Sequence, residues 1–211
     1  MEEISPEKKI IEFKIIFLGD SGVGKSTMIR QFINDDFNPN QLSTLGVLFS
    51  TKVLTINNKQ FNFKLINTSS QEKYKSMSIP YLKHVDIVLF VFDLNSTKSF
   101  DNIQYWIDFF NKNNDGISLK GKYLIGNKSD LEQNVEQNLI DQIIKKNELL
   151  YLSINAKAKS QIEQMFEYII ENLYEYVENN EKNKCDKNDK KEKFLSKDNI
   201  YNGKKKKNRC V

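Results

Sequence analysis

The sequence predicts an α/β protein in which a mostly parallel β-sheet carries helices on both faces. Short apolar runs typical of buried strands alternate along the chain with segments whose apolar residues recur at helical spacing. One run, residues 85–92, is almost entirely apolar, as expected of a strand that is covered on both faces. In such folds ligands bind beyond the carboxyl ends of the strands, so functional residues are expected in the loops there.

Each expected element follows from one of these two patterns. The runs that predict strands are residues 13–18, 47–56, 60–66, 85–92, 122–126 and 149–154, with a turn at 57–59 between the second and third. Helical spacing of apolar residues predicts helices over residues 27–33, 100–110, 140–144 and 162–173.

A glycine-rich loop directly follows the first predicted strand. Residues 19–26, G-D-S-G-V-G-K-S, fit the pattern G-x-x-x-x-G-K-[ST] between a strand and a helix. Glycines let successive backbone N–H groups point into one concavity, and the helix N-terminus adds a partial positive charge. The alternative is a glycine turn beside a solvated lysine. The loop predicts a phosphate site in which Lys25 reaches the terminal phosphates and Ser26 binds Mg²⁺. The residues expected to contact the nucleotide are Gly19, Asp20, Ser21, Gly22, Val23, Gly24, Lys25, Ser26 and Thr27.

A second polar motif, Asn127-Lys128-Ser129-Asp130, follows the predicted strand at 122–126. The Asp130 carboxylate can accept hydrogen bonds from N1–H and the exocyclic amine of guanine, which adenine cannot supply. Sites built around such a pair reject the wrong partner by roughly 10⁴–10⁵. The aliphatic part of Lys128 can lie against the base. The motif therefore predicts selectivity for guanine and disfavours an unrelated phosphate-loop ATPase.

With these motifs, residues 10–178 resemble the small GTPases of the Ras superfamily, and the Rab branch most closely. The resemblance implies the phosphate-loop GTPase fold, a six-stranded mostly parallel sheet flanked by about five helices. Residues 44–49, T-L-G-V-L-F, are similar to the first switch segment, which implies that Thr44 closes over Mg²⁺ and the γ-phosphate. Phe37 would pack edge-on against guanine, and Gln71 would orient the attacking water. Residues Asn155, Ala156 and Lys157 align with the family's S-A-K, whose alanine N–H contacts guanine O6.

The third nucleotide-binding motif departs from the family pattern. Residues 66–72 are I-N-T-S-S-Q-E where the family has W-D-T-A-G-Q-E. Asn67 replaces the aspartate that holds Mg²⁺ and leaves a weaker, water-mediated ligand. Ser70 replaces a glycine whose N–H meets the γ-phosphate. We therefore expect guanine recognition to be retained, with weaker Mg²⁺ coupling and slow hydrolysis that depends on Gln71, Lys25 and Thr44.

The resemblance implies a molecular switch that binds GTP or GDP with Mg²⁺ and hydrolyses GTP to regulate vesicle trafficking. Effectors, exchange factors and GTPase-activating proteins would bind through residues 37–49 and 66–80. The alternative is a non-hydrolysing Rab-like protein that acts as a constitutive binding module; Asn67 and Ser70 favour it, whereas the intact phosphate loop and Gln71 favour a working switch.

Charge divides the chain into an acidic body and a basic tail. Residues 1–180 hold 20 Lys and Arg against 23 Asp and Glu, whereas residues 181–211 hold 12 against 5. We expect a short extension at 1–9, the GTPase domain at 10–178 and a disordered basic tail at 179–211. The basic run 204–209 predicts contact with an anionic membrane, and Cys210 is the expected prenylation site. An unmodified tail is the alternative; a nucleic-acid-binding patch is disfavoured, so no nucleic acid partner is expected. These features predict a cytoplasmic protein attached peripherally to the cytosolic face of an endomembrane or the plasma membrane.

Overall fold

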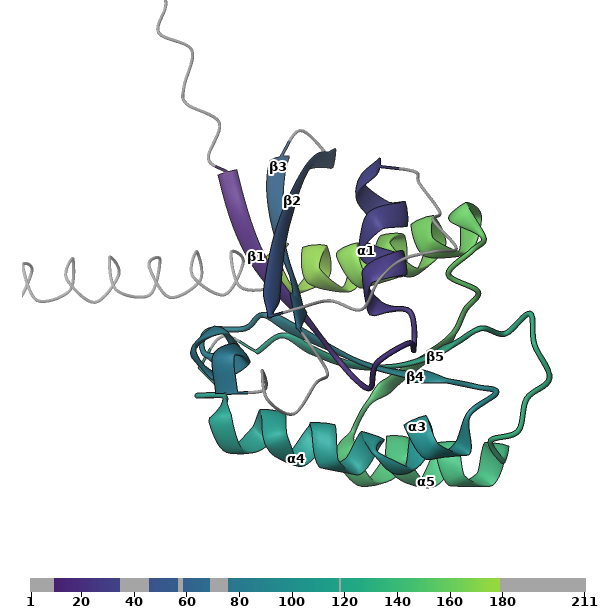
Figure 1. Ribbon diagram of the computed structural model, residues 1–211. Coiled ribbons are helices and arrows are strands. Elements are labelled where there is room, and N and C mark those ends of the chain that lie inside the picture. Colours follow the sequence, from purple (N-terminus) through teal and green to yellow (C-terminus); the bar gives the residue numbers. More distant parts are fainter. Residues whose placement is uncertain (1–9, 35–45, 57–58, 69–75, 118, 179–211) are drawn as a thin grey trace, which may run out of the picture. The chain divides into compact units, whose positions relative to one another are not determined.

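The computed structural model describes residues 10–34, 46–56, 59–68, 76–117 and 119–178 (Figure 1). Contacts along the chain divide it into two units, Met1–Tyr168 and Ile169–Val211. Of the second unit, the structure describes residues 169–178, which are helical. The elements described below belong to the first unit. Within the described part of the chain, no helix is both long and apolar enough to cross a membrane.

The first unit contains a six-stranded sheet in the order β2-β3-β1-β4-β5-β6. Strands β2 and β3 pair antiparallel, and all other neighbouring strands pair parallel. The predicted fold class is therefore confirmed, with a hairpin at one edge of the sheet. The strands are β1 (Ile10–Leu18), β2 (Val47–Ile56), β3 (Lys59–Thr68), β4 (Ile87–Asp93), β5 (Gly121–Asn127) and β6 (Leu150–Ser153).

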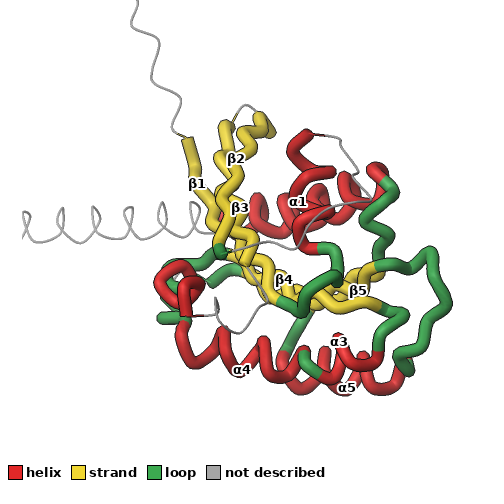
Figure 2. Tube along the Cα trace, viewed as in Figure 1, coloured by secondary structure: helices red, strands yellow, loops and turns green. Residues whose placement is uncertain are grey.

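Helices cover both faces of this sheet, as the apolar strands require (Figure 1). Helix α1 and helical residues 159–168 lie on one face, and α3, α4 and α5 lie on the other. The loops that join strands to helices are green in Figure 2. Figure 1 labels the helices α1 (Lys25–Asn34), α3 (Thr97–Asp101), α4 (Ile103–Asn113) and α5 (Gln137–Asn147); the 3₁₀ helix η1 (Ile79–Leu82) lies between β3 and β4 in the chain.

The helix predicted over residues 100–110 is two helices in the structure. Helix α3 begins after Ser96, whose side chain accepts a hydrogen bond from the backbone N–H of Ser99. It ends at Asp101, and α4 begins after Asn102. The apolar spacing in the sequence continues across this junction because both helices turn their apolar sides toward the sheet. The pattern therefore located the buried face but not the break.

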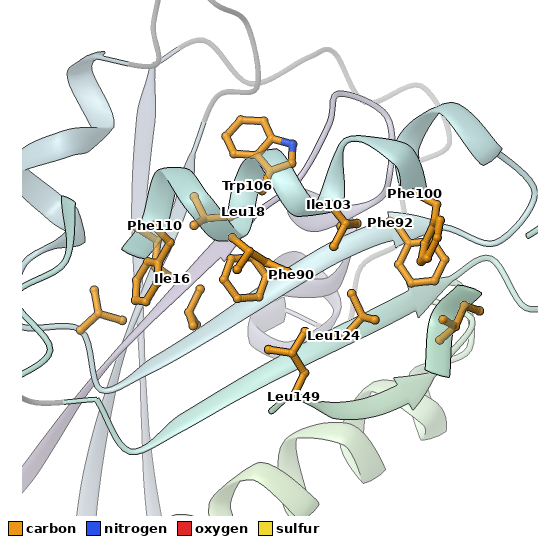
Figure 3. Packing of buried hydrophobic residues seen from close by; sticks show 14 of the residues in the cluster. Ile16, Leu18, Phe90, Phe92, Phe100, Ile103, Trp106, Phe110, Leu124 and Leu149 are labelled. Atoms are coloured by element: carbon orange, nitrogen blue, oxygen red, sulfur yellow. The ribbon is translucent and has the colours of Figure 1, made fainter. Parts of the chain in front are cut away.

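The core explains why strands β1 and β4 are apolar at nearly every position. On one face, Phe90 of β4 packs edge to face on Phe110 of α4, with ring centroids 5.9 Å apart. Figure 3 shows α4 residues beside the side chains of β1 and β4. On the other face, Phe166 stacks on Phe32 of α1 with centroids 3.6 Å apart and also contacts Phe17. Successive residues of β1 thus point into two cores, which fixes the ends of both strands and the loops beyond them.

Candidate nucleotide-binding site

The loop between β1 and α1 has the backbone that a phosphate site requires. Gly19 and Gly24 have φ values of +147° and +104°, which side-chain-bearing residues rarely adopt. A Cβ atom on Gly19 would lie 2.1 Å from the carbonyl oxygen of Val91, and one on Gly24 would lie 2.1 Å from Nδ2 of Asn127. The loop is therefore pressed against β4 and β5, and its glycines are needed for close packing as well as for conformation.

Lys25 is the first residue of α1 and is buried, with 6% of its surface exposed. Its Nζ donates hydrogen bonds to the carbonyl oxygens of Gly19 at 2.8 Å and Asp20 at 2.7 Å. Burial lowers the pKa of Lys25 to about 7, and the Asp20 carboxylate partly opposes this change. A phosphate group at the loop would favour the charged ammonium in the same way, so Lys25 suits the predicted role.

Ser26 and Asn67, the two predicted metal residues that the structure describes, lie side by side. Asn67 is opposite Phe17 in the pairing of β1 with β3, and its Nδ2 donates to Ser26 Oγ at 2.7 Å. Within the described residues, no cluster of three His, Cys, Asp or Glu side chains could hold a metal. Hydroxyl and amide oxygens are hard ligands, and Mg²⁺ usually keeps several waters and uses one or two protein groups plus phosphates. The oxygens of this pair suit a magnesium ion held mainly by nucleotide and water, and the Asn67 oxygen would have to replace its nitrogen beside Ser26 to serve as a ligand.

Asn127 connects the phosphate loop to the two loops that follow β5 and β6. Its Nδ2 donates to the carbonyl oxygen of Val23 at 2.7 Å, and its Oδ1 accepts from the backbone N–H of Ala156 at 2.9 Å. Asn127 is only 2% exposed. The resemblance implied that the Ala156 N–H contacts guanine, whereas in the structure it donates to Asn127. One side chain thus contacts two segments that are distant in the sequence, one 104 residues before it and one 29 residues after it.

The charged residues of the predicted guanine site form two ion pairs. Lys128 has a positive φ of +63°, and its Nζ lies 2.7 Å from Asp93 Oδ2 at the end of β4. Lys157 Nζ lies 2.9 Å from Asp130 Oδ2. The hydrogen bond from the Lys157 ammonium holds the pKa of Asp130 below its usual value. Asp130 is exposed and ionised, so it can accept hydrogen bonds from a base.

Around the predicted guanine motifs, sequence reasoning missed Asp93 and Gln161. Asp93 pairs with Lys128, and Gln161 accepts the backbone N–H of Asn155 at 2.6 Å. The position of Asp93, a carboxylate at the end of an apolar strand, was a usable signal. Gln161 gave no comparable signal because it lies in an amphipathic helical segment.

Asp20, the second residue of the phosphate loop, has one partner on α4 and one at the cap residue that precedes it. Its Oδ1 accepts the indole N–H of Trp106 at 2.8 Å, and its Oδ2 accepts Nδ2 of Asn102 at 2.6 Å. Trp106 is 2% exposed and belongs to the core, which agrees with the packing role that its helical position predicts. The hydrogen bond to the loop was not predicted.

Several predicted residues lie outside the described part of the chain. They are Phe37, Thr44, Ser70, Gln71 and Cys210, together with the basic run at 204–209. Their predicted roles stay predictions.

The amino-acid sequence is similar to a known protein family and to several curated proteins. The Ras family profile matches residues 14–175, a range that contains every described residue of the site. The chain is 34% identical over 172 residues to "Ras-related protein Rab-11B" of Dictyostelium discoideum, covering 79% of this chain and 77% of the relative. It is 33% identical over 172 residues to "Ras-related protein Rab-2B" of the same organism, covering 80% and 83%. It is 30% identical over 187 residues to "Ypt/Rab-type GTPase ypt7" of Pyricularia oryzae, covering 84% and 89%.

Proposed function

This chain belongs to the Ras family, in its Rab branch, and from that premise we propose that it is a guanine-nucleotide switch. It binds GTP and GDP with Mg²⁺, hydrolyses GTP slowly and regulates vesicle trafficking at membranes. The alternative, a non-hydrolysing relative that serves as a constitutive binding module, shares the nucleotide site and differs only in turnover.

The observation that carries this proposal is the position of Asn127. Its amide joins the phosphate loop at Val23 to the 155–157 segment at Ala156, next to Asp130 in its own loop. Phosphate groups and a purine base belong to the same ligand, so their binding residues must be held at a fixed separation. A single buried side chain that fixes both loops supports a nucleotide as that ligand.

The residues of this site divide the binding of the nucleotide among them. Backbone N–H groups of the loop and the Lys25 ammonium hold the terminal phosphates, and Asp130 accepts hydrogen bonds from guanine. Ser26 and Asn67 would hold Mg²⁺, which neutralises phosphate charge when bound. By family resemblance, Gln71 and the Thr44 carbonyl orient a water that attacks the γ-phosphorus. The bond between this phosphorus and the leaving oxygen breaks as the water attacks.

Asn67 supports slow hydrolysis. The residue is 4% exposed and directs its amide nitrogen toward Ser26 Oγ. A carboxylate at this position would add a full negative charge near the cation, whereas the neutral amide does not. Mg²⁺ coupling is therefore weak, and the charge that develops during phosphoryl transfer is less well neutralised.

Partners bind the switch segments 37–49 and 66–80. At the border of these segments, Phe49 of β2 is 57% exposed and packs edge to face on the partly exposed Tyr81 of η1, with ring centroids 4.9 Å apart. Exposed aromatic rings are enriched at protein interfaces because they bury large apolar areas at small entropic cost. Effectors and regulators that read the nucleotide state contact this pair.

The domain at 10–178 is tethered to a membrane through the tail at 179–211. The run 204–209 contains four lysines and one arginine immediately before Cys210. Each basic residue near an anionic surface contributes about 1 kcal/mol of binding, and one prenyl group alone gives weak attachment. The two signals together attach the chain peripherally to the cytosolic face of the membrane.

Nucleotide binding by the full chain tests the switch. Displacement of fluorescent GDP by GDP, GTP or ATP measures selectivity, with and without Mg²⁺. We expect a guanine preference that Asp130→Ala lowers by roughly 10⁴-fold. Glu132→Ala, which removes a carboxylate two residues away, is the control and should leave the preference unchanged. Equal binding of ATP and GTP by the wild-type chain would contradict the proposal.

Phosphate release separates the two candidates. A slow release that Gln71→Leu lowers further supports the hydrolysing switch. Tight GTP binding with no release above that of Gln71→Leu supports the constitutive binding module instead.

Incubation with a prenyltransferase and a labelled prenyl diphosphate tests the tail: label should enter the wild-type chain but not Cys210→Ser.

A further inference from the structure

We infer that helix α4 positions the phosphate loop, with Trp106 and Asn102 acting as positioning residues for phosphate binding through the carboxylate of Asp20. This inference rests on the proposed nucleotide-binding function and deepens it. It assigns to α4, which contributes no predicted nucleotide contact, a direct role in the geometry of the site.

The Asp20 carboxylate is held at both of its oxygens. Both oxygens of one carboxylate accept hydrogen bonds from the start of α4, at 2.6 Å from Asn102 Nδ2 and 2.8 Å from Trp106 Nε1. Residues four apart lie on the same face of a helix, so both donors approach Asp20 from one side. Two donors on two oxygens fix both the orientation of the carboxylate and its distance from Asn102 and Trp106.

The indole donor is held rigidly by its neighbours. Trp106 is buried in the core between the sheet and α4 and contacts the rings of Tyr105 and Phe109 edge to face. An indole ring packed on its faces and edges cannot rotate freely, and its N–H is a donor only. The ring therefore offers Asp20 a fixed donor position that the core determines.

Asp20 also contacts Lys25, the lysine proposed to bind phosphate. The main-chain carbonyl of Asp20 accepts Lys25 Nζ at 2.7 Å, while the side chain of the same residue is bound to α4. A displacement of Asp20 would therefore displace one of the acceptors that orient Lys25. Contacts run in sequence from the core through Trp106 and Asp20 to Lys25.

The negative charge of Asp20 explains why hydrogen bonds to its carboxylate from outside the loop would favour phosphate binding. Short carboxylate side chains readily accept hydrogen bonds from nearby backbone N–H groups, and in this loop those groups are the ones that would hold phosphate. The two donors, Trp106 of α4 and its cap residue Asn102, bind the carboxylate outside the loop. Asp20 therefore does not compete with the phosphates for the N–H groups, and its repulsion of them is reduced by the hydrogen bonds it accepts.

Two variants separate this role from general folding. Trp106→Phe keeps an aromatic ring and removes the N–H; Asn102→Asp keeps the side-chain shape and places a like charge against Asp20. Each should weaken GDP binding by about 10-fold, because hydrogen bonds to charged groups are among the stronger ones. Guanosine, titrated by NMR at millimolar concentration, should bind each variant as it binds the wild type, since it has no phosphate. Asn113→Ala, at the other end of α4, is the control and should change neither affinity.

The chain's single tryptophan allows the contact to be tested without nucleotide. Its indole N–H gives one NMR resonance, which Asp20→Ala should shift strongly if the hydrogen bond exists, even if Trp106→Phe fails to fold. An unshifted resonance would overturn the inference. Unchanged GDP affinity in a folded Asn102→Asp chain would also overturn it, as would equal losses for GDP and guanosine. Failure of the wild-type chain to bind GDP would instead contradict the proposed function, whatever the indole resonance shows.

Discussion

Replacing Asn127 with alanine should destabilise the whole nucleotide site, even before any nucleotide is added. The side chain makes two hydrogen bonds, to the carbonyl of Val23 and from the N–H of Ala156, at 2.7 and 2.9 Å. Asn127, Val23 and Ala156 are all buried, so water cannot easily replace the lost amide.

The magnitude follows from these two bonds. A buried polar group that loses its partner costs about 1–3 kcal/mol, so two such groups predict a loss of about 2–6 kcal/mol in the free energy of unfolding. Partial entry of water would place the loss near the lower end. For a domain of about 150–250 residues each kilocalorie lowers the melting temperature by about 2–4 °C, which predicts a decrease of at least roughly 4 °C.

Urea unfolding of the full chain without nucleotide provides the measurement. Asn134→Ala is a matched control, because this exposed asparagine also donates through Nδ2, to the carbonyl of Asn95 at 3.0 Å. Its removal should cost less than about 1 kcal/mol, since both groups can reach water. Equal losses for Asn127→Ala and Asn134→Ala would refute the conclusion that Asn127 holds the three loops together.

Three further changes test other parts of the site. Asn67→Asp should raise Mg²⁺ affinity by about 10–100-fold and lower stability in EDTA because the new carboxylate is buried; an unaltered Mg²⁺ dependence of turnover would contradict the assigned role. Lys157→Met should raise the pKa of Asp130 toward its ordinary 3.8. In the wild type the ion pair stabilises the fold above that pH, and this stabilisation is lost as the pH falls through the lowered pKa. The variant should lack this pH-dependent stabilisation. An NMR titration of the Asp130 carboxyl carbon measures this change. Gly24→Ala should abolish nucleotide binding and lower the melting temperature, because its Cβ would meet Asn127 at 2.1 Å with φ at +104°; a folded, binding-competent variant would show that the loop can move away.

The sequence by itself predicted the fold class, which the structure confirms, and a candidate nucleotide site in the loops that follow the strands. Local patterns are sufficient for this, because apolar runs such as residues 85–92 and helical spacing depend on neighbours along the chain. The phosphate loop and the segment that begins at Asn127 were found for a similar reason. Each is a short motif after a strand, and the carboxyl ends of parallel strands lie on the same side of a sheet.

Only the tertiary structure decided how these segments are held together. The partners of Asp20 lie 82 and 86 residues away, and those of Asn127 lie 104 and 29 residues away. The helical spacing over residues 100–110 predicts that Trp106 packs against the sheet, but it does not predict that its N–H donates to the phosphate loop. A hydrogen bond between distant residues leaves no periodic trace in either segment, since its geometry depends on how strands and helices pack. Residue types suited to binding a nucleotide can therefore be recognised locally, whereas the contacts that orient them exist only in the folded chain.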